Sequence, residues 1–350
     1  MKSFENGFIE KQIITQNLLQ TIRAIGEYKG KQELFTEQSP QVLETLRTAA
    51  VIQSVESSNR IEGITAPSDR IKELVAKKTI PQNRSEQEIA GYRDVLDTIH
   101  VNFDHIPFTP GVVLQFHRDL YQFIPGHGGR WKSSDNEISE ILPDGTKKLR
   151  FKPIPAHLTA EAVEFLHRHF TSAWSSKHIE PLLVVSSYVL DFLCIHPFLD
   201  GNGRMARLIT LLLLYKAGYS VGRYISFEMI VEKTRKSYYD ALFKSSQGWH
   251  EGTHTLIPWW EYFLGVMILS AYKEFENRVG LIIDSHGAKS EMVMTAINKL
   301  SQHFCFSDVA RACPHVSRPT IKRVLGMLRG EGKIVCVKSG RDALWQKTGS

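Results

Sequence analysis

The chain has 350 residues, of which 42% are hydrophobic, enough for one large domain and a smaller one. It has no continuously apolar stretch of about 18 residues, which excludes a membrane-spanning helix. The amino terminus lacks the apolar run of a signal peptide, so we expect a cytoplasmic protein. The net charge is +6, but residues 286–350 hold 11 Lys or Arg and 4 Asp or Glu, a net charge of +7. A basic tail on a near-neutral body suggests an anionic partner for the tail.

The cysteines form no Cys-x-x-Cys pair, and no His cluster completes a zinc site. We expect all four to be buried thiols in a reducing compartment. They are Cys194, Cys305, Cys313 and Cys336.

Helical patterns dominate the chain. Ser39-Pro40 combines a cap with a first-turn proline and predicts a helix that runs towards Ile61. Thr109-Pro110 opens another helix in the same way, and residues 88–99 and 160–170 repeat apolar residues at intervals of three and four. Residues 182–193 are nearly apolar all round, which predicts a central, buried helix.

One stretch favours strands. Residues 134–142 and 147–154 flank Pro143-Asp144-Gly145, and Asp-Gly is typical of a tight turn. We therefore predict a β-hairpin, which could be a structural flap or an edge that holds an extended peptide.

Helices resume after Ser226, with one beginning near Val231 and another from Pro258 to about Val279. The basic tail predicts helices at 290–301, 307–312 and 317–329, then strands at 333–338 and 343–346 that turn at Ser339-Gly340. A boundary near residues 284–287 precedes it. The predicted division is an N-terminal region at 1–83, a core at 84–284 and a C-terminal domain at 285–350.

Residues 196–207, His-Pro-Phe-Leu-Asp-Gly-Asn-Gly-Arg-Met-Ala-Arg, carry the strongest chemical signal. Gly201 and Gly203 free the backbone to turn its N–H groups inward at the start of a helix, where they form an anion hole suited to phosphates. Phe198 is interpreted as an apolar pin that holds the loop against the core.

The polar side chains of this segment complete the set. Arg204 and Arg207 are three apart, so both can grip phosphate oxygens from one helix face. Asp200 offers the hard oxygen that Mg²⁺ prefers. His196, with an ordinary pKa of about 6.5, can accept a proton at neutral pH.

Each part alone has an ordinary structural explanation, because His-Pro often ends a helix and helical arginines are usually solvated. Their combination within one short segment favours in-line attack of an alcohol on phosphorus. The segment resembles the signature of the Fic family, His-x-Phe-x-(Asp/Glu)-Gly-Asn-Gly-Arg-x-x-Arg, at every fixed position. The resemblance implies a mainly α fold with a helical core over roughly residues 84–272. It also implies transfer of AMP from ATP to a Ser, Thr or Tyr hydroxyl of a target protein, which can be the chain itself.

By the same resemblance, His196 would deprotonate the hydroxyl and Asp200 would hold Mg²⁺ against the α- and β-phosphates. Arg204 would contact the phosphate chain and Arg207 the γ-phosphate. The hairpin would be a flap, over about residues 134–154, that pairs with the target main chain. The implied ATP-binding residues are Gly201, Asn202, Gly203, Arg204, Met205, Ala206, Arg207 and, facing the base, Tyr239. Tyr238 and Trp249 are alternatives for the base contact, and ordinary helix packing explains Tyr239 equally well.

An amino-terminal segment carries a second signal. Ser58 and Glu62 are four apart, hence on one helix face, and Gly63 is a natural helix terminator. Residues 58–63 resemble the family's inhibitory motif, (Ser/Thr)-x-x-x-Glu-(Gly/Asn). This implies an inhibitory helix over about 39–62 in which Glu62 pairs with Arg207 and denies it to the γ-phosphate. In some relatives the same glutamate positions a water that removes AMP, and a surface carboxylate is the plain alternative.

The tail resembles a winged helix-turn-helix domain, in which a turn at Cys313-Pro314-His315 separates two helices and a two-stranded hairpin follows. Its basic residues suit phosphate contacts in DNA, although protein contact is an equally simple use. They are Arg318, Lys322, Arg323, Lys338 and Arg341. The second function class is therefore a DNA-binding regulator whose core only senses nucleotide, and a homodimer remains open.

Overall fold

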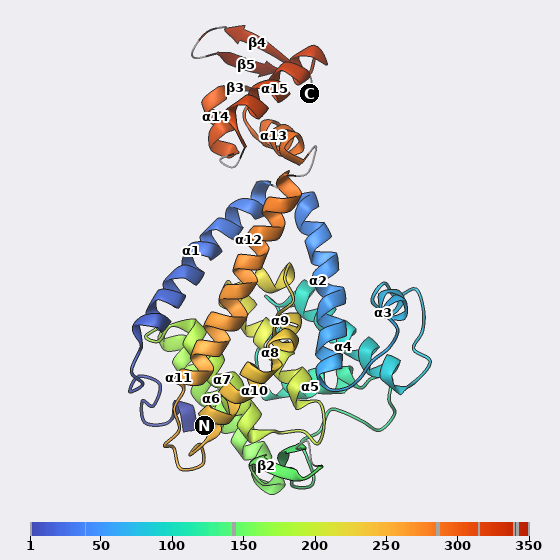
Figure 1. Ribbon diagram of the computed structural model, residues 1–350, viewed down its shortest axis with the longest axis vertical. Coiled ribbons are helices and arrows are strands. Elements are labelled where there is room, and N and C mark those ends of the chain that lie inside the picture. Colours follow the sequence, from blue (N-terminus) through green and yellow to red (C-terminus); the bar gives the residue numbers. More distant parts are fainter. Residues whose placement is uncertain are drawn as a thin grey trace. The chain divides into compact units, whose positions relative to one another are not determined.

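The computed structural model describes residues 2–38, 40–141, 145–284, 288–313, 316–338, 340 and 343–348. They form two compact units, Met1–Glu27 with Arg47–Tyr272 and Tyr28–Leu46 with Lys273–Ser350. The chain is mainly helical, as predicted (Figure 1). No helix in these residues is long and apolar enough to cross a membrane. The three-part division made from the sequence stays a prediction.

Helices are the main elements of the chain up to Asp284. In order they are η1 (Lys2–Phe4), α1 (Gln16–Gln38), α2 (Pro40–Ile61), α3 (Ser68–Val75), α4 (Arg84–Asn102), α5 (Pro110–Leu120), η2 (Ala156–Leu158), α6 (Thr159–Ser176), α7 (Pro181–Ile195), α8 (Asn202–Lys216), η3 (Val221–Arg223), α9 (Phe227–Lys233), α10 (Arg235–Ser246), α11 (Ile257–Trp260), the π-helix η4 (Glu261–Ile268) and α12 (Leu269–Asp284).

Helices α7 and α8 lie at the centre of the first unit, and α7 packs against α6 while α4 packs against α8. Thirteen of the fifteen residues of α7 are buried, which confirms the predicted central helix. Thirteen of the fifteen residues of α8 are buried as well. The loop that joins these two helices is residues 196–201, so the candidate motif is anchored in the core at both ends.

Local capping explains where the helices begin. Thr109 accepts a hydrogen bond from the Val112 amide at 3.2 Å and precedes Pro110, as predicted for α5. Ser226 caps α9 in the same way through the Met229 amide. The cap predicted at Ser39 lies outside the described residues.

The prediction of a helix that begins near Val231 is wrong. Helix α9 ends at Lys233, and Thr234, with φ −110° and ψ 25°, separates it from α10. The Thr234 amide and hydroxyl both bond to the Ile230 carbonyl, which closes α9. Tyr238 and Tyr239 therefore belong to α10, a separate helix.

The predicted hairpin is confirmed. Strands β1 (Ile138–Ile141) and β2 (Lys147–Phe151) pair antiparallel, with Ile138 opposite Phe151 and a bulge after Ile138. Gly145 has a φ of +82°, as a tight turn requires, but Pro143 and Asp144 lie outside the described residues.

The second unit contains the basic tail, with helices α13 (Ala288–Lys299), α14 (Phe306–Ala312) and α15 (Arg318–Gly330). Strands β3 (His303–Cys305), β4 (Ile334–Lys338) and β5 (Leu344–Lys347) form a sheet in the order β3-β5-β4. The three helices and two of the strands confirm the predicted elements. Strand β3 was not predicted, because three residues are too few to show alternation. The turns predicted at Pro314-His315 and at Ser339 lie outside the described residues.

The cysteines are all free thiols. Cys194 and Cys313 are buried as expected, but Cys305 and Cys336 are partly exposed. Cys305 stands at the exposed start of α14, and Cys336 lies on β4, which is an edge strand. The expectation of four buried thiols is therefore wrong for these two.

Candidate functional site

The loop of residues 196–201 leaves α7 through a left-handed residue. His196 has a φ of +51°, and its amide still bonds to the Phe192 carbonyl at 2.9 Å. The Asn202 side chain then locks the loop, because it accepts from the Phe198 amide at 2.9 Å and donates to the Phe198 carbonyl at 2.7 Å. Phe198 is fully buried and stacks on the His117 ring at 3.6 Å, so it pins the loop as expected.

The His196 ring is held in one neutral tautomer. Its Nδ1 lies 3.3 Å from the Leu193 carbonyl, which can only accept, so Nδ1 carries the proton and Nε2 the lone pair. Burial lowers the pKa of His196 to about 4, well under the ordinary value expected from sequence. The imidazole is thus uncharged at neutral pH and can accept a proton at Nε2.

The amino terminus of α8 meets a carboxylate. Gly201 is the N-cap with a φ of +83°, and the N–H groups of residues 202–204 begin the helix without partners inside it. A Cβ built on Gly203 would lie 2.3 Å from Glu62 Oε1. Glu62 therefore fills the space beside the helix terminus where the anion hole is predicted.

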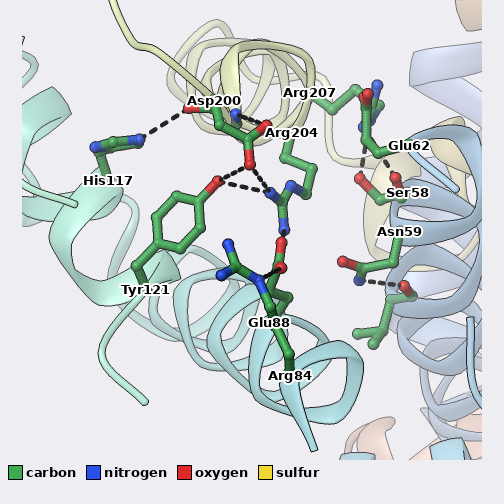
Figure 2. Close-up of polar contacts among 12 residues, drawn as sticks. Ser58, Asn59, Glu62, Arg84, Glu88, His117, Tyr121, Asp200, Arg204 and Arg207 are labelled. Atoms are coloured by element: carbon green, nitrogen blue, oxygen red, sulfur yellow. Dashed lines mark hydrogen bonds and ion pairs between the residues drawn. The ribbon is translucent and has the colours of Figure 1, made fainter. Parts of the chain in front are cut away.

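Arg207 is buried and is held by the end of α2 (Figure 2). Its Nε donates to Ser58 Oγ at 2.8 Å, and its Nη2 donates to the Ser58 carbonyl at 2.9 Å and to Glu62 Oε1 at 2.8 Å. Burial alone would lower the pKa of Arg207, but the charge of Glu62, its hydrogen bond and the nearby Tyr92 and Tyr238 together raise that pKa. Ser58 and Glu62 thus bind one guanidinium from one helix face.

Gly63 places Glu62 at the helix end. Its φ is +79°, and its amide bonds to the Arg60 carbonyl while the Ile64 amide reaches back to the Asn59 carbonyl, both at 3.0 Å. This pair of bonds is the Schellman ending that glycine favours. Gly63 therefore ends α2 as predicted from sequence.

Arg204 lies where the sequence did not suggest. It is fully buried, with Nη1 2.7 Å from Glu88 Oε2 and Nη2 donating to the Tyr121 hydroxyl at 2.8 Å. The Nη1 contact is an ion pair without hydrogen-bond alignment. Since α8 is buried on nearly every side, the spacing of Arg204 and Arg207 does not put both on an accessible face. A contact of Arg204 with the phosphate chain would require it to leave Glu88.

Both carboxylate oxygens of Asp200 accept hydrogen bonds. Its Oδ2 accepts from the Tyr121 hydroxyl at 2.8 Å and its Oδ1 from the Gly201 amide at 2.7 Å (Figure 2). Burial would raise the pKa of Asp200, but the Tyr121 bond and the Arg204 charge outweigh it and lower that pKa. The carboxylate is therefore ionised at neutral pH, and most of its surface is exposed.

Asp200 is the carboxylate predicted to bind Mg²⁺. The described residues contain no group of three or more His, Cys, Asp or Glu that could hold a metal ion by themselves. Asp200 still fits Mg²⁺, since this ion commonly takes one or two carboxylates and completes its shell with phosphate oxygens and water.

Two residues that the motif did not reveal position Asp200. His117 lies in the last turn of α5 and Tyr121 directly follows that helix. His117 Nδ1 accepts from the Gly129 amide at 3.1 Å, so its Nε2 donates to the Asp200 carbonyl, also at 3.1 Å. The sequence shows that His117 and Tyr121 are four residues apart, but no sequence pattern indicates that they contact Asp200.

The remaining predicted contacts differ in accessibility. Tyr239 is 43% exposed, and partial burial and then the charge of Glu62 raise the pKa of its hydroxyl. It is thus an exposed aromatic beside the site. Tyr238 and Trp249 are buried, and Trp249 donates to Asp191, so neither can stack on a base.

Besides the two arginines, three residues of the predicted ATP site have buried side chains. They are Asn202, Met205 and Ala206. The Met205 amide is already bonded to the Gly201 carbonyl at 2.9 Å. Any role of these residues towards a nucleotide stays a prediction and would pass through backbone atoms or through the shape of the loop.

Comparison with known proteins agrees with the motif. Residues 107–214 match the model of the Fic/DOC family. The protein adenylyltransferase Fic of Nematostella vectensis is 26% identical over 207 residues, 57% of this chain and 44% of that protein. The protein of the same name from Drosophila erecta is 25% identical over 245 residues, 67% of this chain and 45% of that protein. The chain thus matches less than half the length of these relatives.

The fold has solved counterparts. The crystal structure of a Fic family protein from Desulfovibrio desulfuricans superimposes with a TM-score of 0.62. It is 21% identical and covers 97% of this chain and 98% of its own. At this identity the likeness shows the fold, which is the mainly helical fold expected from the motif.

We predict that Gly203→Ala destabilises the protein by about 1–3 kcal/mol, because its Cβ would collide with the Glu62 carboxylate. In a Glu62→Gly background the same change should be neutral or stabilising by up to about 1 kcal/mol, since alanine favours a helix over glycine. A double-mutant cycle of urea unfolding measures this coupling. An equal cost in both backgrounds would contradict the placement of Glu62.

Proposed function

We propose that the chain, whose residues 107–214 match the Fic/DOC family model, transfers AMP from ATP to a Ser, Thr or Tyr hydroxyl of a target protein. The observation that carries the proposal is a neutral His196, with Nε2 unprotonated, next to a helix terminus suited to phosphates. The names of the relatives support the same chemistry.

The proposed reaction is one in-line displacement. The target hydroxyl loses its proton to His196 Nε2, and its oxygen bonds to the α-phosphorus of ATP as the bond to pyrophosphate breaks. The N–H groups of residues 202–204 receive phosphate oxygens. Mg²⁺ held by Asp200 would neutralise phosphate charge. The products are an AMP–protein phosphodiester, pyrophosphate and a protonated His196.

The hairpin supplies a place for the target. Among the described residues, strands β1 and β2 form a sheet of two strands, so each has an edge that no other described strand pairs with. An extended target segment can add to such an edge through main-chain hydrogen bonds, which would fix the hydroxyl relative to His196. Tyr239, exposed beside Glu62, is the residue we propose for the adenine contact.

Glu62 is the proposed brake on this reaction. It occupies Arg207 and the space beside Gly203 at once. A γ-phosphate needs the same guanidinium and repels the same carboxylate, so both cannot be bound together. ATP would bind productively only after Glu62 withdraws. The carboxylate is 32% exposed, so it has room to withdraw towards solvent.

The tail suggests a second activity, which we propose as DNA contact by a winged helix. Helix α15 has no acidic residue, and Arg318, Lys322 and Arg323 are exposed on it. Lys338 at the end of β4 is exposed too, and Arg341 lies outside the described residues. A basic helix that follows a helical turn is the arrangement that reads DNA in such domains.

His196→Ala should reduce AMP transfer by about 10²–10⁴-fold, because the hydroxyl loses its base. The assay follows label from α-³²P-ATP into protein, with γ-³²P-ATP as the test for a kinase. His178→Ala, which changes an exposed histidine, should transfer at the wild-type rate. Transfer that survives in His196→Ala, or label that comes from the γ-position, would refute the mechanism.

Glu62→Gly should raise self-labelling by α-³²P-ATP at least about tenfold, because Arg207 is released to the γ-phosphate. Glu56→Ala is the matched control, since Glu56 lies on the same helix and pairs with Arg60 instead. If the variant labels no faster than wild type and also fails to remove AMP from labelled protein, Glu62 acts in AMP removal and not as a brake.

A duplex DNA gel shift should appear at low salt and weaken steeply as salt rises, because phosphate contacts release counterions. Combined Arg318→Ala, Lys322→Ala and Arg323→Ala substitutions should abolish it, whereas Lys72→Ala in the first unit should not. Absence of any shift at low salt would remove the DNA proposal.

A further inference from the structure

The segment of residues 132–136 holds the backbone on both sides of His196. The Lys132 amide donates to the Pro197 carbonyl at 2.8 Å, and its Nζ donates to the Ile195 carbonyl at 3.1 Å. Asn136 Nδ2 then donates to the Phe198 carbonyl at 3.0 Å. Three carbonyls around the left-handed His196 are thus bonded to one short segment.

The Lys132 ammonium is buried among uncharged acceptors, which is unusual for a lysine. The residue is only 4% exposed, and Nζ bonds to two uncharged oxygens, Asn136 Oδ1 at 2.9 Å and the Ile195 carbonyl. Within the described part of the chain no carboxylate lies at ion-pair distance from it, and Asp135 acts only from further away. A buried cation without an ion pair is costly, whereas an apolar side chain of this size would not be. The cost suggests that the charge itself is used.

The charge lies beside the proposed base. The charged groups that act on His196 are Lys132, which favours the neutral ring, and Glu62 and Asp200, which favour the protonated one. Lys132 also stands at the carboxyl end of α7, where a cation is favoured by the helix dipole. Its charge therefore opposes the two carboxylates and adds to burial, which is the main cause of the low pKa of the imidazole.

The same segment is the base of the hairpin. It directly precedes β1, and Asp135 Oδ1 accepts from the Ala156 amide at 2.7 Å, which closes the stem beyond β2. The segment that bonds to the carbonyls around His196 is therefore also bonded to the stem of the hairpin.

We propose that Lys132 is a positioning residue that fixes the backbone around His196 and keeps a positive charge beside the imidazole, so that its Nε2 stays open to the target hydroxyl. This inference rests on the proposed role of His196 as the base.

The test compares Lys132→Gln with Lys132→Arg, because glutamine keeps a donor for the Ile195 carbonyl and loses the charge, whereas arginine keeps the charge. Lys152→Gln is the control, since Lys152 is exposed beside the hairpin. The His196 ring is titrated by NMR, which needs no activity. Transfer from α-³²P-ATP is measured against pH in parallel.

We expect Lys132→Gln to raise the pKa of His196, to move the acid limb of the activity profile to higher pH and to slow transfer by about tenfold or more. Lys132→Arg should restore the wild-type titration. An unchanged His196 titration in a folded Lys132→Gln protein would overturn the proposal, even if that protein melts earlier, and so would failure of arginine to restore it. If the wild type transfers no AMP, the proposed function fails, yet the titration still decides whether Lys132 sets the charge of the ring.

Discussion

A buried guanidinium must be given anions or carbonyl oxygens, and among the described residues Arg207 donates to Ser58 in the last turn of α2 and to Glu62 directly after it. This requirement draws Ser58 and Glu62 to the start of α8. Because the two are one helical turn apart and Gly63 ends the helix directly after them, the carboxylate arrives beside Gly203. Only glycine leaves room for it there. The ion pair between Arg207 and Glu62 therefore connects the start of α8 to the end of α2.

The remainder of the site is built around the same loop by separate supports. The end of α5 holds Asp200, through the His117 imidazole and the hydroxyl of Tyr121, which directly follows the helix. Arg204 donates to the Tyr121 hydroxyl and forms a buried ion pair with Glu88. The pair is thus connected, through that hydroxyl, to the Asp200 carboxylate. Residues 132–136 hold the other end of the loop.

Much of this could be predicted because the motif is continuous in the chain. Residues 196–207 lie between two apolar helices, and the 3.6-residue periodicity and proline-led starts locate those helices well. Ser58 and Glu62 could be matched to each other because they share a helix face. Asp-Gly marked the hairpin.

The supports could not be predicted, since periodicity identifies a buried face but not the partner that buries it. Lys132, Tyr121 and Glu88 lie some 60 to 120 residues from the groups they contact, and no local pattern connects them. Arg204 was expected to be accessible from its spacing, but α8 is enclosed on nearly all sides. The low pKa of His196 likewise comes from burial, which a residue type does not report.

The central claim is that Glu62 stands where a γ-phosphate must bind. Crystals of the wild type and of Glu62→Gly, each grown with Mg²⁺ and an ATP analogue that resists cleavage at the α-phosphorus, test it directly. We predict that the γ-phosphate contacts Arg207 in the variant, whereas the wild type keeps the Arg207–Glu62 pair and holds the γ-phosphate elsewhere. The same phosphate pose in both crystals, with Arg207 still bound to Glu62, would contradict the account.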